Sequence, residues 1–255
     1  MIALASTSAT LRELDRRFAA CDLPHLQTLG RFKGQPATLG NQLWDAHNLD
    51  VIVAQYVEEY GAADRRALLS HWSKSYLEAL LPGALAACLL LDRQLPLSVD
   101  TLSVQLDAEG SVERILLSAG TLVLPEDADL YQRCEALLDT NLAPFVDALA
   151  SHARISKRAL WGNVAAYLAW ALRLLVEHCG LPPARLIQAL QLFSAPVFPD
   201  GRPNPVQRAY HFPENAQDAP WRRVCCLRYC LPELPYCADC PLVRLKSEEP
   251  CKKVP

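Results

Sequence analysis

Glycine is scarce in this sequence, and the loops that depend on glycine are missing with it. Only 10 of the 255 residues are glycine, and the two closest are Gly30 and Gly34. Neither the G-x-G-x-x-G dinucleotide motif nor the G-x-x-x-x-G-K-[ST] phosphate loop is present. The serine-hydrolase motif G-x-S-x-G and the zinc-protease motif H-E-x-x-H are also absent. The common nucleotide-binding, serine-hydrolase and zinc-protease functions therefore lose their main support.

The chain also lacks a long apolar run and a strong charge of one sign. Its most apolar run, residues 79–91, contains Pro82 and is shorter than the roughly 20 residues of a membrane span. A second apolar stretch, residues 159–176, is interrupted by Asn163 and Arg173. The N-terminus has no basic region, and the net charge of −3 argues against a nucleic-acid partner. We therefore expect a cytoplasmic protein with at most a peripheral association with the inner membrane.

The spacing of apolar residues is helical over most of the chain. It predicts helices from a capping box at Thr10 and Glu13, over residues 64–91 and over residues 129–176. Pro82 is expected to kink or end the second of these helices. Residues 102–106 and 112–117 alternate apolar and polar side chains around a turn, which predicts a β-hairpin, with a third strand at residues 122–124. We predict an α+β fold, mostly helical, with a small antiparallel hairpin region.

Cysteine is the residue that the sequence has in excess. There are 10 cysteines, and four of them follow the spacing C-C-x10-C-x2-C at Cys225, Cys226, Cys237 and Cys240. A C-x-x-C pair can place two thiolates on one ion, but a structural zinc site usually has two such pairs, and adjacent side chains in an extended backbone point in opposite directions. On spacing alone, three kinds of site stay open: an iron–sulfur cluster, a zinc knuckle, and a redox-active or structural disulfide.

The cysteine motif and its neighbours resemble the FhuF family of bacterial ferric-siderophore reductases. The C-terminal residues that agree, besides the four cysteines, are Arg222-Arg223, Arg228-Tyr229, Leu231-Pro232 and Asp239. Upstream, the segments His71-Trp72-x3-Tyr76 and Leu160-Trp161-x-Asn163-x3-Tyr167 are similar to the family's apolar segments. The likeness covers the middle and C-terminal thirds of the chain.

The resemblance implies both a cofactor and an activity. It implies that Cys225, Cys226, Cys237 and Cys240 hold a [2Fe–2S] cluster in a C-terminal cluster-binding segment, residues 216–255. Residues 1–215 would form a siderophore-interacting α+β domain. The implied activity is one-electron reduction of an imported ferric siderophore, of the hydroxamate type, which releases Fe²⁺ in the cytoplasm because Fe²⁺ has less preference for hard oxygen donors. The implied partners are the siderophore, an unidentified electron donor and a functionally linked siderophore uptake system.

Other residues near the motif are assigned smaller roles. Cys230 stands where the family has a different residue, and we predict that it is a bystander because the four-ligand spacing is complete without it. Cys251 lies beyond the motif and is predicted to be a tail thiol. The three arginines beside the cysteines are expected to offset thiolate charge.

A bulky, partly apolar chelate suits a groove with aromatic walls and a few polar groups. The candidate substrate contacts are Trp72, Tyr76, Trp161, Asn163, Arg222, Arg223 and Arg228. The aromatic members also have the spacing of a buried helix face, so core packing is the competing interpretation. Asn163 must find a polar partner in its apolar helix.

Two other functions stay open. The first is a zinc-stabilised interaction module without redox activity, which iron content and the visible spectrum would distinguish from a cluster protein. The second is a relative of siderophore-biosynthesis enzymes, but it requires a nucleotide site, and the sequence contains no phosphate-binding signature.

Overall fold

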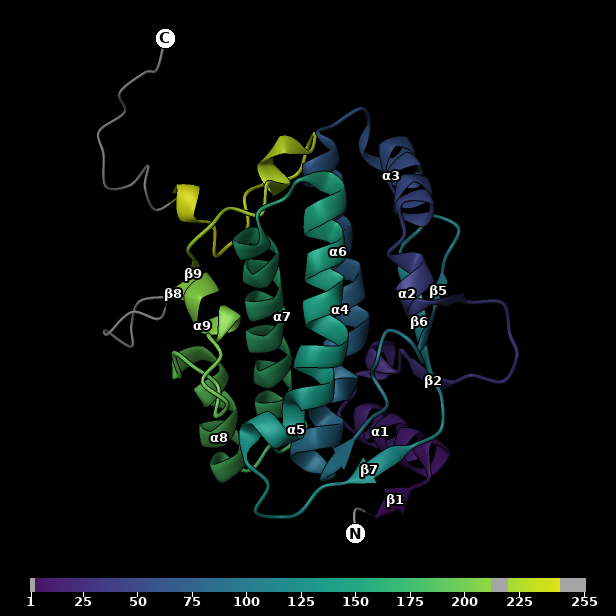
Figure 1. The fold of residues 1–255 in the computed structure, drawn as a ribbon, viewed down its shortest axis with the longest axis vertical. Helices are drawn as coiled ribbons and strands as arrows, with labels where there is room; N and C mark the ends of the chain where they lie inside the picture. Colours follow the sequence, from purple (N-terminus) through teal and green to yellow (C-terminus); the bar gives the residue numbers. More distant parts are fainter. Residues whose placement is uncertain (1–2, 212–219, 244–255) are drawn as a thin grey trace.

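The computed structural model describes residues 3–211 and 220–243, in which helices surround one long central helix (Figure 1). The helices are α1 (Thr7–Ala20), α2 (Gly40–Leu43), α3 (Ala46–Tyr60), α4 (Arg65–Leu90), α5 (Leu130–Leu137), α6 (Ala143–Ala153), α7 (Lys157–Glu177), α8 (Pro183–Ser194) and α9 (Pro205–Ala209). Short helical turns lie at η1 (Pro24–Leu26), η2 (Leu138–Leu142) and η3 (Arg228–Cys230). The predicted mostly helical α+β fold is confirmed.

The strands are short and form small sheets. They are β1 (Leu4–Ala5), β2 (Leu29–Arg31), β3 (Thr38–Leu39), β4 (Arg93–Gln94), β5 (Ser103–Leu106), β6 (Val112–Leu117), β7 (Thr121–Val123), β8 (Tyr210–His211) and β9 (Trp221–Arg222). The predicted hairpin is β5–β6, which lies in a sheet of order β2-β6-β5-β3 with β2 parallel to β6. The predicted third strand is β7, but it pairs with β1 and β4 in a separate sheet.

The central helix α4 continues through Pro82, so of the two predicted outcomes, a kink or an end, the end is wrong. The helix is buried on all sides around this point, and packing outweighs the loss of one backbone hydrogen bond. The hydroxyl of Thr28 donates a hydrogen bond to the carbonyl oxygen of Ala79 (2.6 Å), which ties the segment before β2 to this part of the helix. Gly83 lets strand β2 approach closely, because a Cβ at that position would lie 2.5 Å from Leu29 Cδ1.

Helices α6 and α7 lie beside α4 and complete the helical layer (Figure 1). Within the described part of the chain, α7 is the helix long and apolar enough to cross a membrane, but 61% of its most apolar stretch is buried inside the protein. Such burial is typical of the core helix of a soluble protein, and one such helix is weak evidence for a membrane span.

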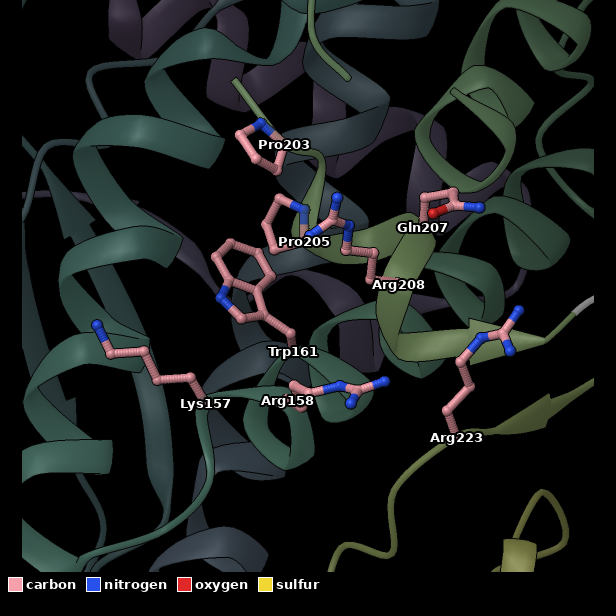
Figure 2. A pocket seen from close by; sticks show the side chains of 8 residues that line it. All are labelled: Lys157, Arg158, Trp161, Pro203, Pro205, Gln207, Arg208 and Arg223. Atoms are coloured by element: carbon pink, nitrogen blue, oxygen red, sulfur yellow. The ribbon is translucent and has the colours of Figure 1, made fainter. Parts of the chain in front are cut away.

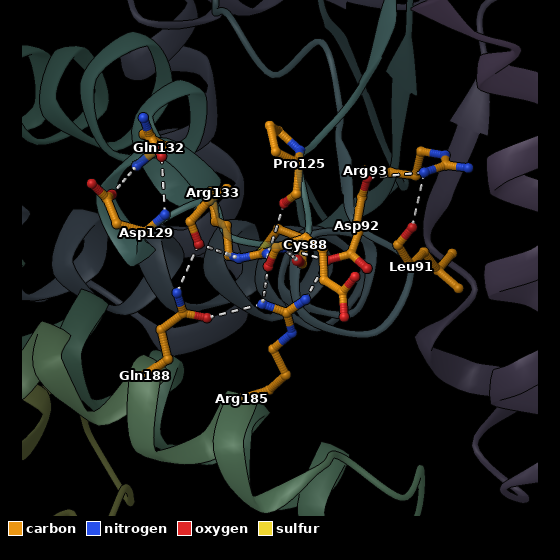
Figure 3. A network of polar contacts seen from close by, with 12 residues as sticks. Cys88, Leu91, Asp92, Arg93, Pro125, Asp129, Gln132, Arg133, Arg185 and Gln188 are labelled. Atoms are coloured by element: carbon orange, nitrogen blue, oxygen red, sulfur yellow. Dashed lines mark hydrogen bonds and ion pairs between the residues drawn. The ribbon is translucent and has the colours of Figure 1, made fainter. Parts of the chain in front are cut away.

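A buried arginine joins the far end of α4 to α5 and α8 (Figure 3). The guanidinium of Arg133 donates hydrogen bonds to the carbonyl oxygens of Cys88 (3.0 Å) and Ala128 (3.0 Å), and it pairs with the carboxylate of Asp92. Arg185 of α8 binds the same carboxylate oxygen of Asp92 at 2.7 Å. The network fixes the end of the helical layer that lies away from the cysteines.

The cysteine segment, residues 220–243, covers the end of the molecule where α4 and α7 begin (Figure 1). It contributes little to the hydrophobic core. Leu231 is its fully buried apolar core member, and Val224, Leu227, Cys230 and Leu234 are partly buried against the core. The rest of the core comes from residues upstream.

Candidate metal centre

Three of the four cysteines of the C-C-x10-C-x2-C motif are in contact through Cys226. The Sγ atoms of Cys226 and Cys237 lie 3.3 Å apart, and the thiol of Cys225 forms a hydrogen bond with that of Cys226. Cys240 is linked to Cys225 by an electrostatic interaction. Cys226 and Cys240 are buried, whereas Cys225 and Cys237 are half-buried. We call these four cysteines the thiol group.

The thiol group fits a metal centre in residue type and proximity. Two thiolates about 2.3 Å from one tetrahedral ion lie about 3.8 Å apart. The observed 3.3 Å separation of Cys226 and Cys237 is close to that value and well beyond a disulfide bond of about 2.05 Å. No three His, Cys, Asp or Glu side chains within residues 3–211 and 220–243 already stand in a finished metal-binding arrangement. The cysteines thus match a metal centre in the type of ligand that they offer, but they do not form a complete coordination geometry.

A buried lysine from α4 faces the thiol group. The Nζ atom of Lys74 lies 3.4 Å from Cys226 Sγ and 3.7 Å from Cys237 Sγ. Lys74 is only 6% exposed, so its ammonium has little water to stabilise it. A lysine is almost never buried this far without a negative partner, which indicates that the nearby sulfur atoms carry negative charge in the working protein.

The surroundings of Cys226 favour its thiolate form. Hydrogen bonds from the thiols of Cys225 and Cys237 lower the pKa of Cys226, and the charges of Lys74 and Arg222 lower it further. Burial acts in the opposite direction but is outweighed. Because the thiolate is the form that binds a metal, this environment prepares Cys226 as a ligand.

Arg222 holds the C-x-x-C loop in place. Its Nε donates a hydrogen bond to Asp239 Oδ2 at 2.7 Å, and its backbone N–H donates to the carbonyl oxygen of Asp239 at 3.0 Å. The hydroxyl of Tyr210 donates to the same carboxylate oxygen at 2.7 Å. Asp239 stands between Cys237 and Cys240, so these bonds fix the loop against β8 and β9. Arg222 is 4% exposed, which makes it a buried clamp and not the surface contact to substrate that we predicted.

Asn163 of α7 connects this clamp to α4. Its amide nitrogen donates to the carbonyl oxygen of Ser70 (3.0 Å) and the hydroxyl of Ser73 (2.9 Å), and its amide oxygen accepts from Arg222. The hydroxyl of Ser70 donates to the carbonyl oxygen of Cys226 at 2.8 Å. Asn163 thus has the polar partners that its apolar helix requires, and it is completely buried. Its position favours a supporting role beneath the thiol group.

Trp72 and Tyr76 lie in the core. Both side chains are 0% exposed, and they pack against Trp44 and Phe145. The indole of Trp72 donates to the carbonyl oxygen of Gly110 (2.9 Å), so its polar atom is satisfied internally. A bulky chelate cannot reach either ring in this arrangement, and the predicted substrate contacts at these two positions are corrected to core packing.

Trp161 and Arg223 line an open cleft of about 580 Å³ beside the cysteine segment (Figure 2). The other lining residues are Lys157, Arg158, Pro203, Pro205, Gln207 and Arg208. We call this site the basic cleft. Two of the predicted substrate contacts line the basic cleft: Trp161, on α7, and Arg223, which directly follows β9.

The charge of Arg228 acts on His71, which lines a second polar cleft of about 450 Å³ together with Lys74. Burial is the largest factor that lowers the pKa of His71 to about 4, and the charges of Lys74 and Arg228 lower it further. The Nε atom of Arg228 has no hydrogen-bond partner in the described part of the chain. The roles of Arg228 in offsetting thiolate charge and in contacting the chelate remain predictions.

Cys230 lies on η3, where its side chain forms a hydrogen bond with Tyr229. Its backbone N–H donates to the carbonyl oxygen of Leu227 at 2.9 Å. Cys225 acts electrostatically on the same Tyr229, so the bystander role of Cys230 remains a prediction. Cys251 lies outside the described residues.

The sequence analysis missed three residues that contact the cysteine segment: Ser70, Lys74 and Tyr210. Lys74 could have been noticed, because it is a charged residue in the apolar stretch between Trp72 and Tyr76. Ser70 and Tyr210 left no such signal, because their importance comes from contacts across 156 and 29 positions of sequence.

Comparison with known proteins gives two findings. The sequence model of a family described as "Ferric iron reductase FhuF-like transporter" matches residues 70–219. A protein of Escherichia coli (strain K12) named "Ferric siderophore reductase" is 24% identical over 179 residues, which cover 70% of this chain and 67% of that protein. The family match includes Lys74 and Asn163 and ends before the first cysteine of the thiol group.

Proposed function

Because the chain belongs to the FhuF family, we propose that it is a ferric-siderophore reductase whose electron passes from an iron–sulfur centre on Cys225, Cys226, Cys237 and Cys240. The similarity to a protein named ferric siderophore reductase supports the activity. The observation that carries the cofactor is the Cys226–Cys237 sulfur pair, 3.3 Å apart, with the buried ammonium of Lys74 at 3.4 and 3.7 Å.

The type of centre follows from the donor set. Four cysteine thiolates match a [2Fe–2S] cluster, which supplies one electron at a time when bound. Lys74 and Arg222 place two positive charges beside the four sulfurs, and positive charge favours the more negative, reduced form of such a group. The half-buried Cys225 and Cys237 keep the centre near the surface, where a ferric chelate can approach it.

The chemistry requires no acid, base or nucleophile from the protein. Fe³⁺ in a hydroxamate siderophore gains one electron and becomes Fe²⁺, which binds hard oxygen donors less strongly and leaves. The protein's own residues hold the centre, orient the C-x-x-C loop and bind the chelate nearby. We propose that this takes place in the cytoplasm, in connection with siderophore uptake and with a separate electron donor.

The proposed function also divides the chain into two parts. We propose a siderophore-interacting domain of residues 1–215 and a cluster-binding segment of residues 216–255. The small contribution of the cysteine segment to the core supports this division. The boundary itself falls within residues 212–219, outside the described residues.

The test is purification of the full chain without oxygen. We expect a coloured protein with iron and inorganic sulfide in equal amounts, whose visible absorption bleaches with dithionite and returns when a ferric siderophore is added. An Fe²⁺-specific dye should report one Fe²⁺ per cluster oxidised. A colourless protein that contains zinc would instead identify the interaction module, and a coloured protein that no ferric chelate reoxidises would contradict the reductase activity.

Replacing Lys74 by methionine should make the centre harder to reduce. A unit charge at about 4 Å contributes about 4 kcal/mol at an effective dielectric constant of about 20. For a one-electron reduction, a tenfold change in the equilibrium constant corresponds to about 59 mV in the reduction potential. Solvent screening reduces the effect of the lost charge, so we expect the reduction potential to fall by on the order of 100 mV. A potentiometric titration of the visible absorption measures this shift.

Lys33→Met is the matched control, because Lys33 is an exposed lysine in the loop after β2. It removes the same charge and should leave the potential unchanged. Lys74→Arg should restore most of the wild-type potential. An unchanged potential in Lys74→Met would mean that this ammonium does not act on the centre.

A further inference from the structure

The basic cleft contains an unusual concentration of positive charge for a protein whose net charge is −3. Four cationic side chains line it, from Lys157, Arg158, Arg208 and Arg223, and within residues 3–211 and 220–243 no carboxylate lines it. Figure 2 shows these side chains arranged around Trp161. Its volume of about 580 Å³ lies within the range of small-molecule sites.

Most of this charge is not neutralised by the protein itself. Lys157 pairs with Asp147 at 2.7 Å, on a surface where both side chains are 60% exposed. No carboxylate within residues 3–211 and 220–243 pairs with Arg158, Arg208 or Arg223. Arg223 uses its Nε for the carbonyl oxygen of Tyr210 (3.0 Å), which orients the guanidinium and leaves its charge uncompensated. Three arginines without anionic partners favour an anionic ligand.

The floor of the cleft suits a ligand with flat or apolar parts. Trp161 is 8% exposed and offers an indole surface between the charged side chains, and Pro203 and Pro205 add apolar walls. The cleft also lies at the N-terminus of α7, a helix of 21 residues whose N-cap Ser156 makes no side-chain hydrogen bond. The backbone N–H of Ala159 already donates to the carbonyl oxygen of Ser156 (2.9 Å), so what the helix end adds beside the arginines is the positive end of its dipole.

The basic cleft is connected directly to the thiol group. Arg223 precedes Cys225 by two residues, so their Cα atoms are at most about 7 Å apart. Arg222 and Arg223 are neighbours whose side chains go to opposite sides: Arg222 inward to Asp239, and Arg223 outward to the cleft. At the floor, α7 approaches the cysteine segment closely, because a Cβ on Gly162 would lie 3.8 Å from the carbonyl oxygen of Val224.

From these observations we infer that the basic cleft binds the ferric siderophore, and that this siderophore carries net negative charge from carboxylate or catecholate groups. The inference rests on the proposed reductase function but changes its substrate, from a plain hydroxamate to a hydroxamate that also carries carboxylates or to a catecholate. One electron moves from the reduced centre to the ferric ion, and no bond forms between protein and chelate. The complex becomes one unit more negative, which the arginines stabilise, and Fe²⁺ then passes to water or another ligand. An uncharged trihydroxamate would gain little from these arginines.

The first experiment measures binding without electron transfer. Ga³⁺ has the charge of Fe³⁺ and is not reduced by the protein, so gallium chelates report binding to the full chain alone. We would titrate an uncharged trihydroxamate, a citrate–hydroxamate chelate that carries carboxylates, and a tricatecholate, and follow the heat of binding. We expect both anionic chelates to bind at least tenfold more tightly than the uncharged one, with affinity falling as salt rises.

Variants then locate the site. Arg158→Gln and Arg208→Gln should each weaken binding of the anionic chelates about tenfold and leave the uncharged chelate unaffected. Arg173→Gln is the matched control, because Arg173 is exposed on the same helix, about 22 Å further along. Preference for only one of the two anionic chelates would identify the source of the charge. Equal binding of all three chelates, or unchanged affinity in both variants, would overturn the inference.

A second readout separates this inference from the proposed function. In the cluster-loaded protein, the two variants should raise KM for ferric anionic chelates and leave the visible spectrum and the potential unchanged. If the protein reduces ferric chelates but the variants do not change KM, the cleft assignment is wrong and the reductase activity stands. If no cluster forms while gallium chelates still bind in the cleft, the proposed function fails and the binding site stands.

Discussion

Cys240→Ser is expected to abolish cluster binding and with it all reduction of ferric siderophore. Cys240 is buried at 4% exposure, so water has little access to replace it, and its backbone N–H donates to the carbonyl oxygen of Cys237 at 3.1 Å, which closes the C-x-x-C turn. Serine preserves the size but offers a hydroxyl that remains protonated at neutral pH and binds iron–sulfur clusters poorly. Iron content and visible absorption after anaerobic reconstitution measure the loss.

Cys230→Ser provides the comparison within the same segment. Because its thiol contacts Tyr229, we expect that variant to keep at least most of the iron and the activity. Cys226→Ser should behave like Cys240→Ser. A Cys230 variant that loses the cluster, together with a Cys226 variant that retains it, would show that the ligand set is wrong.

Arg222→Met should release the C-x-x-C loop from the rest of the protein. Removing one partner of a buried ion pair costs about 3 to 5 kcal/mol, because the remaining groups stay buried without compensation. Here the groups left behind are the carboxylate of Asp239 and the amide oxygen of Asn163, while the hydroxyl of Tyr210 keeps its hydrogen bond to Asp239. Asp239 is 18% exposed and can recover some hydration, so we expect a loss of about 3 kcal/mol in the free energy of unfolding. Urea unfolding of the metal-free protein measures it.

Arg223→Met is the natural control for this experiment. Arg223 is the next residue, it is exposed, and its loss should change the free energy of unfolding by no more than about 0.5 kcal/mol. The Arg222→Met protein should also release iron faster than wild type during dilution. Equal unfolding energies for the two variants would show that the Arg222–Asp239 contact does not hold the loop.

The local sequence pattern was sufficient to predict those helices and strands that depend mainly on their own residues. Alternation around a turn predicted β5 and β6, and helical spacing predicted α4 and α7. The start of α1 was misplaced, because Ser6 caps the helix by accepting from Ala9 N–H, while Thr10 donates to the carbonyl oxygen of Ser6. Pro82 was misjudged for a different reason: the packing around α4 is long-range and invisible in the local sequence.

The candidate site shows the same division between local and distant causes. Spacing pointed to four cysteines, of which Cys225, Cys226 and Cys237 are in contact, and the need for a polar partner correctly marked Asn163 as unusual. The partner itself, Arg222, lies 59 positions away and could not be read from a helix pattern. The aromatic residues at helical spacing divided according to burial: Trp72 and Tyr76 entered the core, and Trp161 reached the wall of a cleft.

The cysteine segment contributes little to the hydrophobic core, and this bears on what happens to the protein under oxidative stress. Small zinc domains depend on metal for their folding, and they unfold when it is removed. Here the hydrophobic core draws only Leu231 fully from the segment, and Ser70, Lys74 and Asn163 stand on helices that belong to the main body. If the proposed cluster were lost, the helices beneath it would keep their packing. All of the basic cleft except Arg223 would also remain, because its other lining residues lie on α7 and in or just before α9. A new cluster could then be inserted without synthesis of a new chain.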